Sequence, residues 1–331
     1  MLEQKIYEFV TNYGLIENGD KVVLGVSGGP DSICLLDILH KMRKNGWLQF
    51  EIFVAHVNHG LRENAKIDEE FVKHFCEQIK VPCFVKQVNV KEIAKSEKRG
   101  LEETGRKVRY AFFDEIQEKV GANKIAIAHN QNDHAETIIM NILRGTSTKG
   151  LIGIEKIKGR YIRPLLGTQR LEIEEYLREN QMVARHDESN DDNAYTRNKI
   201  RNIVLPYIQK EFNPNIVETL ERLSSLAKEQ EDYLNRQTEL IYEKICISEK
   251  ENEIILHLKK FNQLEKLVQK RVILYAIERL FGTTKGIEKI HMEDIVKLCH
   301  RNVGNKYLTP NKHVKVALQD KNLKITKMHT F

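Results

Sequence analysis

A short glycine turn between an apolar run and a helical pattern constrains the fold of this chain more than any other segment. Val22–Val26 is a β-branched run, and Ser27–Ser32 reads Ser-Gly-Gly-Pro-Asp-Ser before apolar residues at helical spacing. Pro30 suits the first position of a helix, where no N–H is needed, and Gly28 and Gly29 can take positive φ. The pattern predicts a strand, a tight turn and a helix N-terminus, which carries about half a positive charge and suits phosphate.

The first half of the sequence alternates strand and helix patterns. Strands are expected at Val22–Val26, Phe50–Val57, Phe84–Val88 and Ile125–Ala128. Helices are expected at Ser32–Lys44, Ile67–Lys80, Glu103–Val120 and Ala135–Leu143. This alternation predicts parallel βαβ units with helices on both faces of the sheet. Ligands of such sheets lie beyond the carboxyl ends of the strands, so Ser27–Ser32, His56–Arg62 and His129–Glu136 are expected to share one site.

From Leu151 the pattern changes. Ile152–Leu166 indicates a short hairpin, Gln169–Asn180 an amphipathic helix and Ile216–Lys244 one long charged helix suited to connecting two domains. A strand at Ile254–Leu258, helices near Leu264–Leu280 and Met292–His300, and two closing strands from Lys306 follow. We therefore expect a first domain at 1–212, a connecting helix at 213–250 and a small α+β domain at 251–331.

Composition places the chain among ordinary globular proteins. Its 331 residues suggest about two domains, and 41% hydrophobic with 30% charged residues argues against disorder. No apolar run is long enough for a membrane helix, and the charged N-terminus does not resemble an export signal. The five scattered cysteines favour the reducing cytoplasm. A pI of about 8.8 is weak evidence for nucleic acid on its own.

The glycine turn differs from a Walker A loop. That loop needs a lysine to reach the terminal phosphates, and none stands here. Asp31 occupies the first helical turn instead. A carboxylate beside phosphates is favourable when a magnesium ion lies between them. An N-capped helix after an ordinary glycine turn is the alternative without a ligand.

Two later strand ends are also polar. The second ends in His56-Val57-Asn58-His59-Gly60-Leu61-Arg62, whose spacing in an extended or turning chain favours a polar loop over a metal site. After the fourth, Asp133 is expected as a helix N-cap, with Glu136 completing a capping box. Capping explains these residue types without chemistry, but their place beside the turn favours a function: Asp31 and Asp133 together could hold magnesium.

Basic residues gather in two places. Arg106 and Arg109 share one face at the start of a helix, where positive charge opposes the helix dipole unless an anion compensates it. Arg197, Lys199 and Arg201 place three cations within five residues, which suits a phosphate backbone or an acidic substrate. A solvated basic surface is the alternative in both places.

Ser27–Ser32 resembles the pyrophosphate loop of the N-type ATP pyrophosphatases, which split ATP into AMP and pyrophosphate. Several segments between about Val22 and Arg201, in this order and spacing, are similar to the tRNA(Ile)-lysidine synthetase family. They are Ser27–Ser32, His59–Arg62, Arg106–Tyr110, Ala128–Thr137 with Arg144-Gly145, Arg163–Leu165, and Asp187–Asn190 leading to Arg197-Asn198. The resemblance implies an α/β fold, a Rossmann-like PP-loop ATPase sheet flanked by helices, with a smaller C-terminal α+β domain.

The resemblance also implies a reaction. ATP would adenylate the ring carbonyl oxygen of the wobble cytidine in an isoleucine tRNA with a CAU anticodon. The amine of free L-lysine would then attack that carbon and expel AMP, giving lysidine, which pairs with A instead of G. The implied cofactors are ATP and Mg²⁺. The implied partners are tRNA(Ile), which the C-terminal domain would help to bind, L-lysine, and a second copy of the chain in a homodimer.

The resemblance implies roles for single residues as well. The ATP-binding residues would be Ser27, Gly28, Gly29, Pro30, Asp31, Ser32, His56 and Asn58. Catalysis would rest on Asp31, Arg109 and Asp133, with Asp31 and Asp133 as magnesium ligands. The tRNA or substrate contacts would be Arg62, Arg106, His129, Glu136, Arg144, Arg197 and Arg201.

One departure and three alternatives accompany the resemblance. Many family members carry a further C-terminal domain, and this chain is expected to end after the first. A tRNA-thiolating enzyme of the same fold usually needs a Cys-x-x-Cys pair, which this sequence lacks. A glutamine-dependent amidotransferase would need a glutaminase domain, for which there is no N-terminal extension. A non-catalytic tRNA-binding homologue would need neither the two glycines nor Asp31 in the turn.

Overall fold

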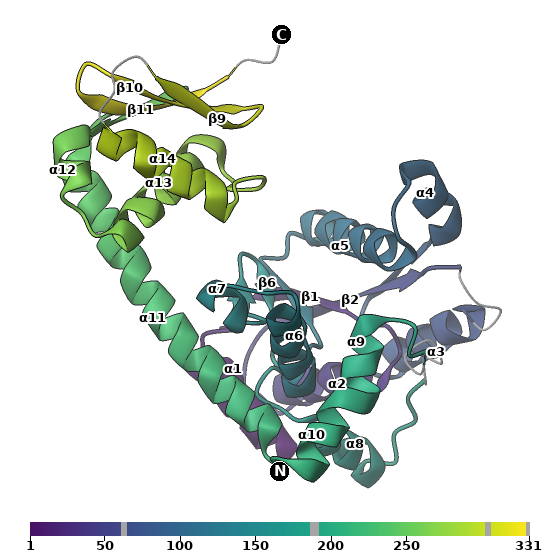
Figure 1. Ribbon diagram of the computed structural model, residues 1–331. Helices are drawn as coiled ribbons and strands as arrows, with labels where there is room; N and C mark the ends of the chain where they lie inside the picture. The colour runs from purple at the N-terminus through teal and green to yellow at the C-terminus, as the bar shows by residue number, and fades with distance from the viewer. Residues whose placement is uncertain (61–64, 186–191, 302–305, 329–331) are drawn as a thin grey trace. The chain divides into compact units, whose positions relative to one another are not determined.

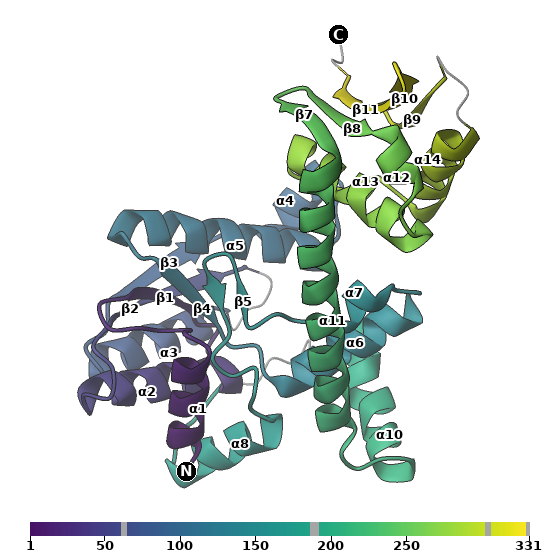
Figure 2. The ribbon, with the colours of Figure 1, turned by 90° about the vertical axis from the view of Figure 1, so that its left-hand side faces the viewer.

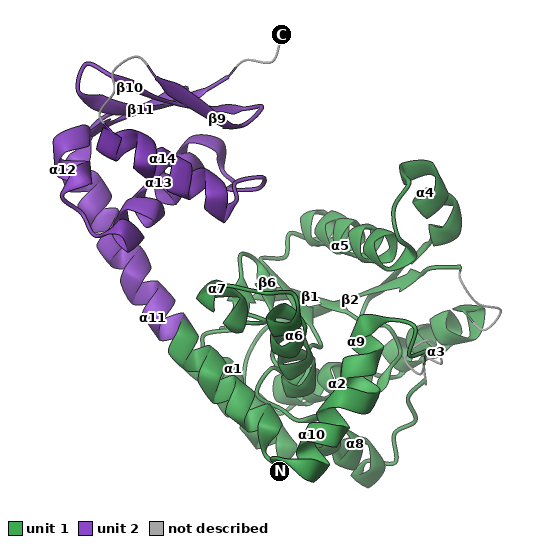
Figure 3. Cartoon of the chain, in the orientation of Figure 1, with its two compact units in different colours: residues 1–227 green, residues 228–331 purple. Residues whose placement is uncertain are grey.

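The computed structural model describes residues 1–60, 65–185, 192–301 and 306–328. The chain divides into two compact units, Met1–Ala227 and Lys228–Phe331 (Figure 3). The boundary falls inside the long helix α11 (Ile216–Ile245), whose predicted bounds differ from these by one residue at the C-terminal end. Each unit has a hydrophobic core of its own.

The first unit contains a six-stranded sheet of order β3-β2-β1-β4-β6-β5. Its strands are β1 (Lys21–Gly25), β2 (Glu51–Asn58), β3 (Cys83–Gln87), β4 (Lys124–Ile127), β5 (Ile157–Lys158) and β6 (Tyr161–Ile162). All pairs are parallel except β5 with β6, which form the predicted hairpin and add it to the edge of the sheet. The prediction of a parallel α/β sheet is confirmed.

Helices cover both faces of this sheet (Figures 1 and 2). The helical elements of this unit are α1 (Leu2–Asn12), α2 (Pro30–Lys44), α3 (Ala65–Gln78), α4 (Val90–Glu97), α5 (Leu101–Val120), α6 (Gln131–Leu143), α7 (Thr148–Leu151), α8 (Arg170–Glu179), α9 (Thr196–Lys199), the π-helical turn η2 (Ile200–Val204) and α10 (Leu205–Glu211). Helices α1 and α4 were not predicted from the sequence. Helix α1 buries only Ile6 and Val10 fully, which is a narrow apolar stripe among charged residues.

The strand β1 contributes to two separate cores. Val22 and Leu24 pack with α1, α2 and α8, whereas Val23 packs with Phe112 and Phe113 of α5 on the opposite face. A strand that is buried on both faces reads as a continuous apolar run instead of an alternating one. This explains why the run before the glycine turn is uniformly apolar.

The residue that joins β1 to the turn must be small. A Cβ atom on Gly25 would lie 2.4 Å from the Phe113 ring. We therefore expect Gly25→Ala to force the ring aside and to lower the free energy of unfolding by about 1–3 kcal/mol, measured by urea denaturation. Phe113→Leu in the same chain should recover part of that loss; a Gly25→Ala variant as stable as the parent would contradict the close packing.

The second unit is an antiparallel sheet with helices packed against it. The strands, in the order β7-β8-β11-β10-β9, are β7 (Cys246–Lys250), β8 (Glu253–His257), β11 (Asn322–Lys327), β10 (Val314–Gln319) and β9 (Tyr307–Asn311). The helices are α12 (Leu258–Asn262), α13 (Lys266–Phe281) and α14 (Lys289–Arg301). The prediction of two closing strands was wrong, because three are present, and β7 was not predicted. No helix in the described part of the chain is long and apolar enough to cross a membrane.

Candidate active site

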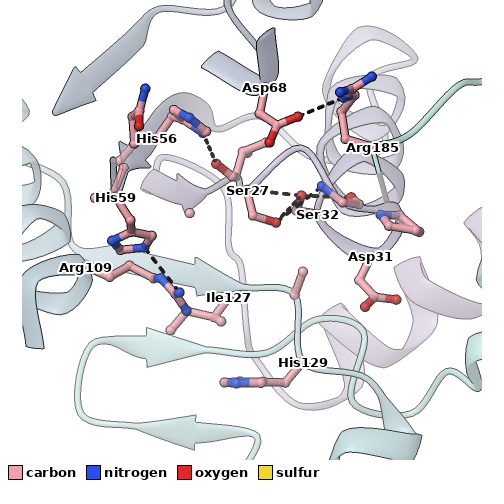
Figure 4. A pocket seen from close by; sticks show the side chains of 18 of the residues that line it. Ser27, Asp31, Ser32, His56, His59, Asp68, Arg109, Ile127, His129 and Arg185 are labelled. Carbon is pink, nitrogen blue, oxygen red and sulfur yellow. Dashed lines mark hydrogen bonds and ion pairs between the residues drawn. The ribbon is translucent and has the colours of Figure 1, made fainter. Parts of the chain in front are cut away.

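A cavity of about 500 Å³ opens at the carboxyl ends of β1, β2 and β4 (Figure 4). Its lining includes the turn after β1, the end of β2 from Ala55 to His59, and Ile127–His129 after β4. The prediction that three polar strand ends meet is therefore confirmed for these residues. Arg62 and Asp187–Asn190 lie outside the described residues.

The turn after β1 is held by its own serine side chains. Ser32 Oγ accepts hydrogen bonds from the backbone N–H groups of Ser27 and Gly28, both at 3.2 Å, and donates to the carbonyl oxygen of Gly29 at 2.9 Å. Ser27 Oγ accepts from the N–H of Gly29 at 3.3 Å. The N–H groups of Ser27, Gly28 and Gly29, which are expected to face phosphate, thus already donate to hydroxyl oxygens of the turn. These donors therefore converge on one region of the turn.

The two glycines of the turn have different backbone conformations. Gly28 has φ +91°, a region that favours glycine. Gly29 has φ −74° and ψ 166° and is the N-cap of α2, with Pro30 at the first helical position as predicted. Positive φ is therefore needed at Gly28 only. A Cβ atom on Gly29 would meet Ser27 Oγ at an ordinary 3.5 Å, so its conformation does not require glycine.

Asn130 connects the two carboxylates that were predicted to hold magnesium. Its Nδ2 donates to Asp31 at 3.0 Å, and its Oδ1 accepts from the N–H of Asp133 at 3.0 Å. Asn130 is fully buried and is the N-cap of α6, and its backbone N–H donates to the carboxylate of Asp133, the third helical residue, at 3.0 Å. The prediction of Asp133 as N-cap was wrong by three residues, because the capping box begins at Asn130.

Asp31 and Asp133 differ in charge environment. Burial, and then the negative charge of Asp133, raise the pKa of Asp31 to about 6. Burial alone would raise the pKa of Asp133 as well, but the positive charges of Arg197 and Arg201 and the hydrogen bond from the backbone N–H of Asn130 outweigh it and lower that pKa. Asp31 is therefore the carboxylate whose charge is poorly compensated by the protein itself.

Two arginines from α9 and η2 form a buried ionic cluster with two carboxylates of α6. Arg197 donates to Glu136 at 2.9 Å and to Asp133 at 3.0 Å. Arg201 donates to Glu136 at 2.6 and 3.1 Å and to Asp133 at 2.8 Å. Glu136 is 1% exposed, and its carboxylate binds arginines instead of completing the predicted capping box. Of these four residues, Arg201 is in the cavity lining.

Two histidines of the cavity are held in defined orientations. His56 Nδ1 lies 2.8 Å from the carbonyl oxygen of Val26 and therefore carries the proton. His129 Nδ1 accepts a hydrogen bond from Arg163 Nε at 3.3 Å. Burial lowers the pKa of His56, and burial is also the largest cause that lowers the pKa of His129, to about 4. Both rings are thus neutral near pH 7.

The predicted arginines divide between the cavity and other surfaces. Arg109 lines the cavity, and its Nη2 lies 3.5 Å from His59 Nε2. It makes no ion pair within the described residues. Arg106 stacks on the Tyr110 ring at 5.1 Å, and Arg144 is the exposed C-cap of α6. Neither Arg106 nor Arg144 is among the lining residues.

Asn58, predicted to bind ATP, organises the end of β2. Its Nδ2 donates to Glu69 at 2.9 Å and to the Ala65 carbonyl at 3.1 Å, and its Oδ1 accepts from the N–H of Gly60. Asn58 still borders the cavity, but the polar atoms of its side chain are engaged with protein groups.

Several lining residues were not predicted from the sequence, among them Asp68, Arg170 and Arg185. Arg185 donates from its backbone N–H to the Gly28 carbonyl at 2.9 Å and from Nε to Asp68 at 2.7 Å, so it lies against the turn (Figure 4). No local pattern could have found these contacts, because 117 residues separate Arg185 from Asp68.

The donor set suits a magnesium ion only in part. No group of three or more metal-ligating side chains occurs within the ranges that the structure describes. Asp31 fits, because its buried and poorly compensated charge would gain from a cation shared with phosphate oxygens. Asp133 fits less well, since one carboxylate oxygen accepts from both arginines and the other from the N–H of Asn130.

Comparison with known proteins identifies the class first. A model of the PP-loop domain matches residues 1–208, so the chain belongs to the PP-loop family. A U34-tRNA thiolase from Methanococcus maripaludis has a similar fold, with a TM-score of 0.58 at 18% identity over 68% of this chain and 78% of that one.

Curated relatives then narrow the class. The chain is 40% identical to a tRNA(Ile)-lysidine synthase from Caldanaerobacter subterraneus and 40% identical to one from Clostridioides difficile, in each case over 93% of its own length. A tRNA(Ile)-lysidine synthase from Clostridium acetobutylicum is 43% identical over 90% of the chain. The chain spans 65%, 67% and 64% of these relatives, about two thirds of their length. Within the PP-loop family it therefore belongs with the tRNA(Ile)-lysidine synthases, as the resemblance implied.

Proposed function

We propose that this chain converts the wobble cytidine of a CAU-anticodon isoleucine tRNA to lysidine, using ATP and free L-lysine. The observation that carries the proposal is the meeting, in one cavity, of the serine-glycine turn, Asp31, Arg109 and His129. The similarity to tRNA(Ile)-lysidine synthases supports the choice of substrates. The ring carbonyl oxygen attacks the α-phosphorus of ATP and pyrophosphate leaves. The lysine amine then attacks the ring carbon that bears this oxygen and loses a proton, and the C–O bond breaks so that AMP leaves with the oxygen.

The turn and the start of α2 would bind the phosphates. The N–H groups of Ser27, Gly28 and Gly29 are satisfied by serine hydroxyls that phosphate oxygens can replace. Rotation of the two hydroxyls would free the amides without moving the backbone. His56, buried at the end of β2, would keep that end rigid beside the nucleotide.

Asp31 would hold magnesium, with Asp133 contributing chiefly through its negative charge. When bound, the ion neutralises charge that develops on the phosphates. Arg109, which lines the cavity and has no ion pair within the described residues, would stabilise the adenylated oxygen. Glu136, Arg197 and Arg201 would fix Asp133 in place through the ionic cluster.

The tRNA would be bound outside the cavity. We assign Arg62, Arg106 and Arg144 to contacts with the phosphates of the tRNA, and residues 251–331 to a small tRNA-binding domain joined by 213–250 to the catalytic part at 1–212. The anticodon base must leave its stack to enter the cavity, as recognition of single-stranded RNA requires. The setting for this chemistry would be the cytoplasm, and a homodimer is the assembly we propose.

The test is lysine incorporation. Purified chain, labelled lysine, ATP, magnesium and CAU-anticodon isoleucine tRNA should give labelled tRNA and one AMP for each lysine. A tRNA with a CAU anticodon from a methionine acceptor, and omission of ATP, serve as controls that should give no label. Binding of the tRNA without any incorporation would favour a non-catalytic homologue, and sulfur incorporation would favour a thiolase.

A further inference from the structure

A buried arginine contacts a histidine that lines the cavity. Arg163 directly follows β6 and is 6% exposed. Its Nε donates to His129 Nδ1 at 3.3 Å, and its Nη1 donates to the carbonyl oxygen of Glu155 at 2.7 Å. His129 in turn borders the cavity. Arg163 therefore touches the histidine without being part of the cavity lining itself.

The chemistry of this contact decides which nitrogen of His129 is protonated. A guanidinium has five N–H donors, no acceptor, and no accessible neutral state. The ring nitrogen that faces it must therefore offer a lone pair. A neutral imidazole has one N–H, so with Nδ1 as acceptor the proton is on Nε2. An imidazolium would place two N–H groups against each other.

The charges around the ring favour the same neutral state. Asp133 of α6 attracts a proton to His129, but Arg163, Arg197 of α9 and Arg106 of α5 oppose it. Burial acts in the same direction as the arginines and is the largest cause of the lowered pKa. The ring is thus held neutral by its surroundings and oriented by one hydrogen bond.

We propose that Arg163 is a positioning residue that fixes His129 as the neutral Nε2–H tautomer, so that this ring gives the cavity a hydrogen-bond donor. The acceptor of that bond is an oxygen that gains negative charge, either on the nucleotide phosphate or on the base being adenylated; this identification rests on the proposed function. This arrangement excludes His129 as the group that takes a proton from the lysine amine, because Nε2 already carries a proton and the lone pair of Nδ1 accepts from Arg163.

His134 provides a matched internal control. Its Nδ1 accepts a hydrogen bond from the backbone N–H of Ile154 at 3.0 Å. Burial is the main cause that lowers its pKa to about 4 as well. The same tautomer is therefore expected at His134, but its partner is the backbone and does not involve Arg163.

The tautomer is measured directly by nitrogen-15 NMR of the imidazole rings in the full chain at pH 7, with the His129 signals identified by their loss in His129→Gln. We expect His129 Nδ1 unprotonated and Nε2 protonated in the parent chain. The reverse tautomer or an imidazolium would overturn the proposal, and this result needs no Arg163 variant that folds. Failure of lysine incorporation with the expected tautomer would contradict the proposed function and leave the positioning role intact.

A variant then tests the cause. In Arg163→Met we expect a mixture of both His129 tautomers, unchanged His134 signals, and a fall in kcat for AMP formation on the order of 100-fold, with KM for ATP changed much less. Arg163→Lys, which keeps a donor, should recover part of the tautomer preference. A folded Arg163→Met chain whose His129 signals match the parent would overturn the assignment of Arg163.

Discussion

Asp31→Asn is expected to stabilise the chain and, at the same time, to abolish ATP-dependent AMP formation. Burial, assisted by Asp133, raises the pKa of Asp31 from 3.8 to about 6. Between these two values the folded chain binds more protons than the unfolded chain, so the free energy of unfolding falls as pH rises through that window. Above pH 6 the parent carries the full penalty of an ionised Asp31.

Asparagine removes that penalty because it has no charge, and it still offers an oxygen to the Nδ2 of Asn130. The gain should be on the order of 2 kcal/mol at pH 7–8 and close to zero near pH 3.5. Urea denaturation of both chains at these pH values measures it. The loss of activity follows from the proposed role of Asp31 beside the phosphates, since a neutral amide is a poor magnesium ligand.

Asp294→Asn makes the same chemical change on the exposed surface of α14, where Asp294 pairs with Lys297. This variant should keep both stability and activity. An Asp31→Asn chain that is less stable than the parent at pH 8 would contradict the charge environment described for Asp31. Retained AMP formation in that chain would contradict its assignment to the site.

The fold could be predicted from the sequence because its strongest signals are local. Each of the four strands predicted in the first half of the sequence lies within about one residue of the observed strand, since β-branched runs are bounded by turn residues on both sides. Pro30 fixes the start of α2 in the same way. The meeting of the strand ends also followed, because the carboxyl ends of parallel strands share one edge of a sheet.

The parts of the site that were not predicted depend on contacts between residues that are far apart in the sequence. The sequence places His129 in the expected site and Arg163 in a segment that carries the resemblance, but these residues are 34 apart and neither segment indicates that they pair. The capping box of α6 could have been predicted from the sequence, because Asn130 stands three residues before Asp133. It was missed because the expected helix began at Ala135 rather than at Gln131.

Arg197 and Arg201 show most clearly what a charge pattern in the sequence cannot predict. The sequence alone predicts that these arginines form a surface for RNA or an acidic substrate, or a solvated face. Neither interpretation included a partner within the chain. The two arginines are four residues apart, and Asp133 and Glu136 are three residues apart on α6, so the two pairs of side chains can face each other. Only the packing of η2 against α6 brings them together.

The ionic cluster gives the largest expected change in stability. Glu136→Ala should lower the free energy of unfolding by about 3–5 kcal/mol, because it leaves two guanidinium groups of low exposure with Asp133 as their remaining carboxylate partner in the cluster. Thermal or urea denaturation measures the loss. Glu115→Ala is the matched control: Glu115 pairs with Lys86 at 2.6 Å, but its side chain is 56% exposed, so the change should stay within about 0.5 kcal/mol.

A double-mutant cycle separates the ion pairs from the loss of side-chain packing. Once Glu136 is absent, Arg201 keeps only Asp133 as its carboxylate partner in the cluster, so removing Arg201 should cost less than it does in the parent chain. The double variant Glu136→Ala, Arg201→Ala should therefore be more stable than the sum of the single losses predicts, by on the order of 1–3 kcal/mol. Strictly additive losses, or a Glu136→Ala chain no less stable than Glu115→Ala, would show that the cluster does not hold α6 and η2 together.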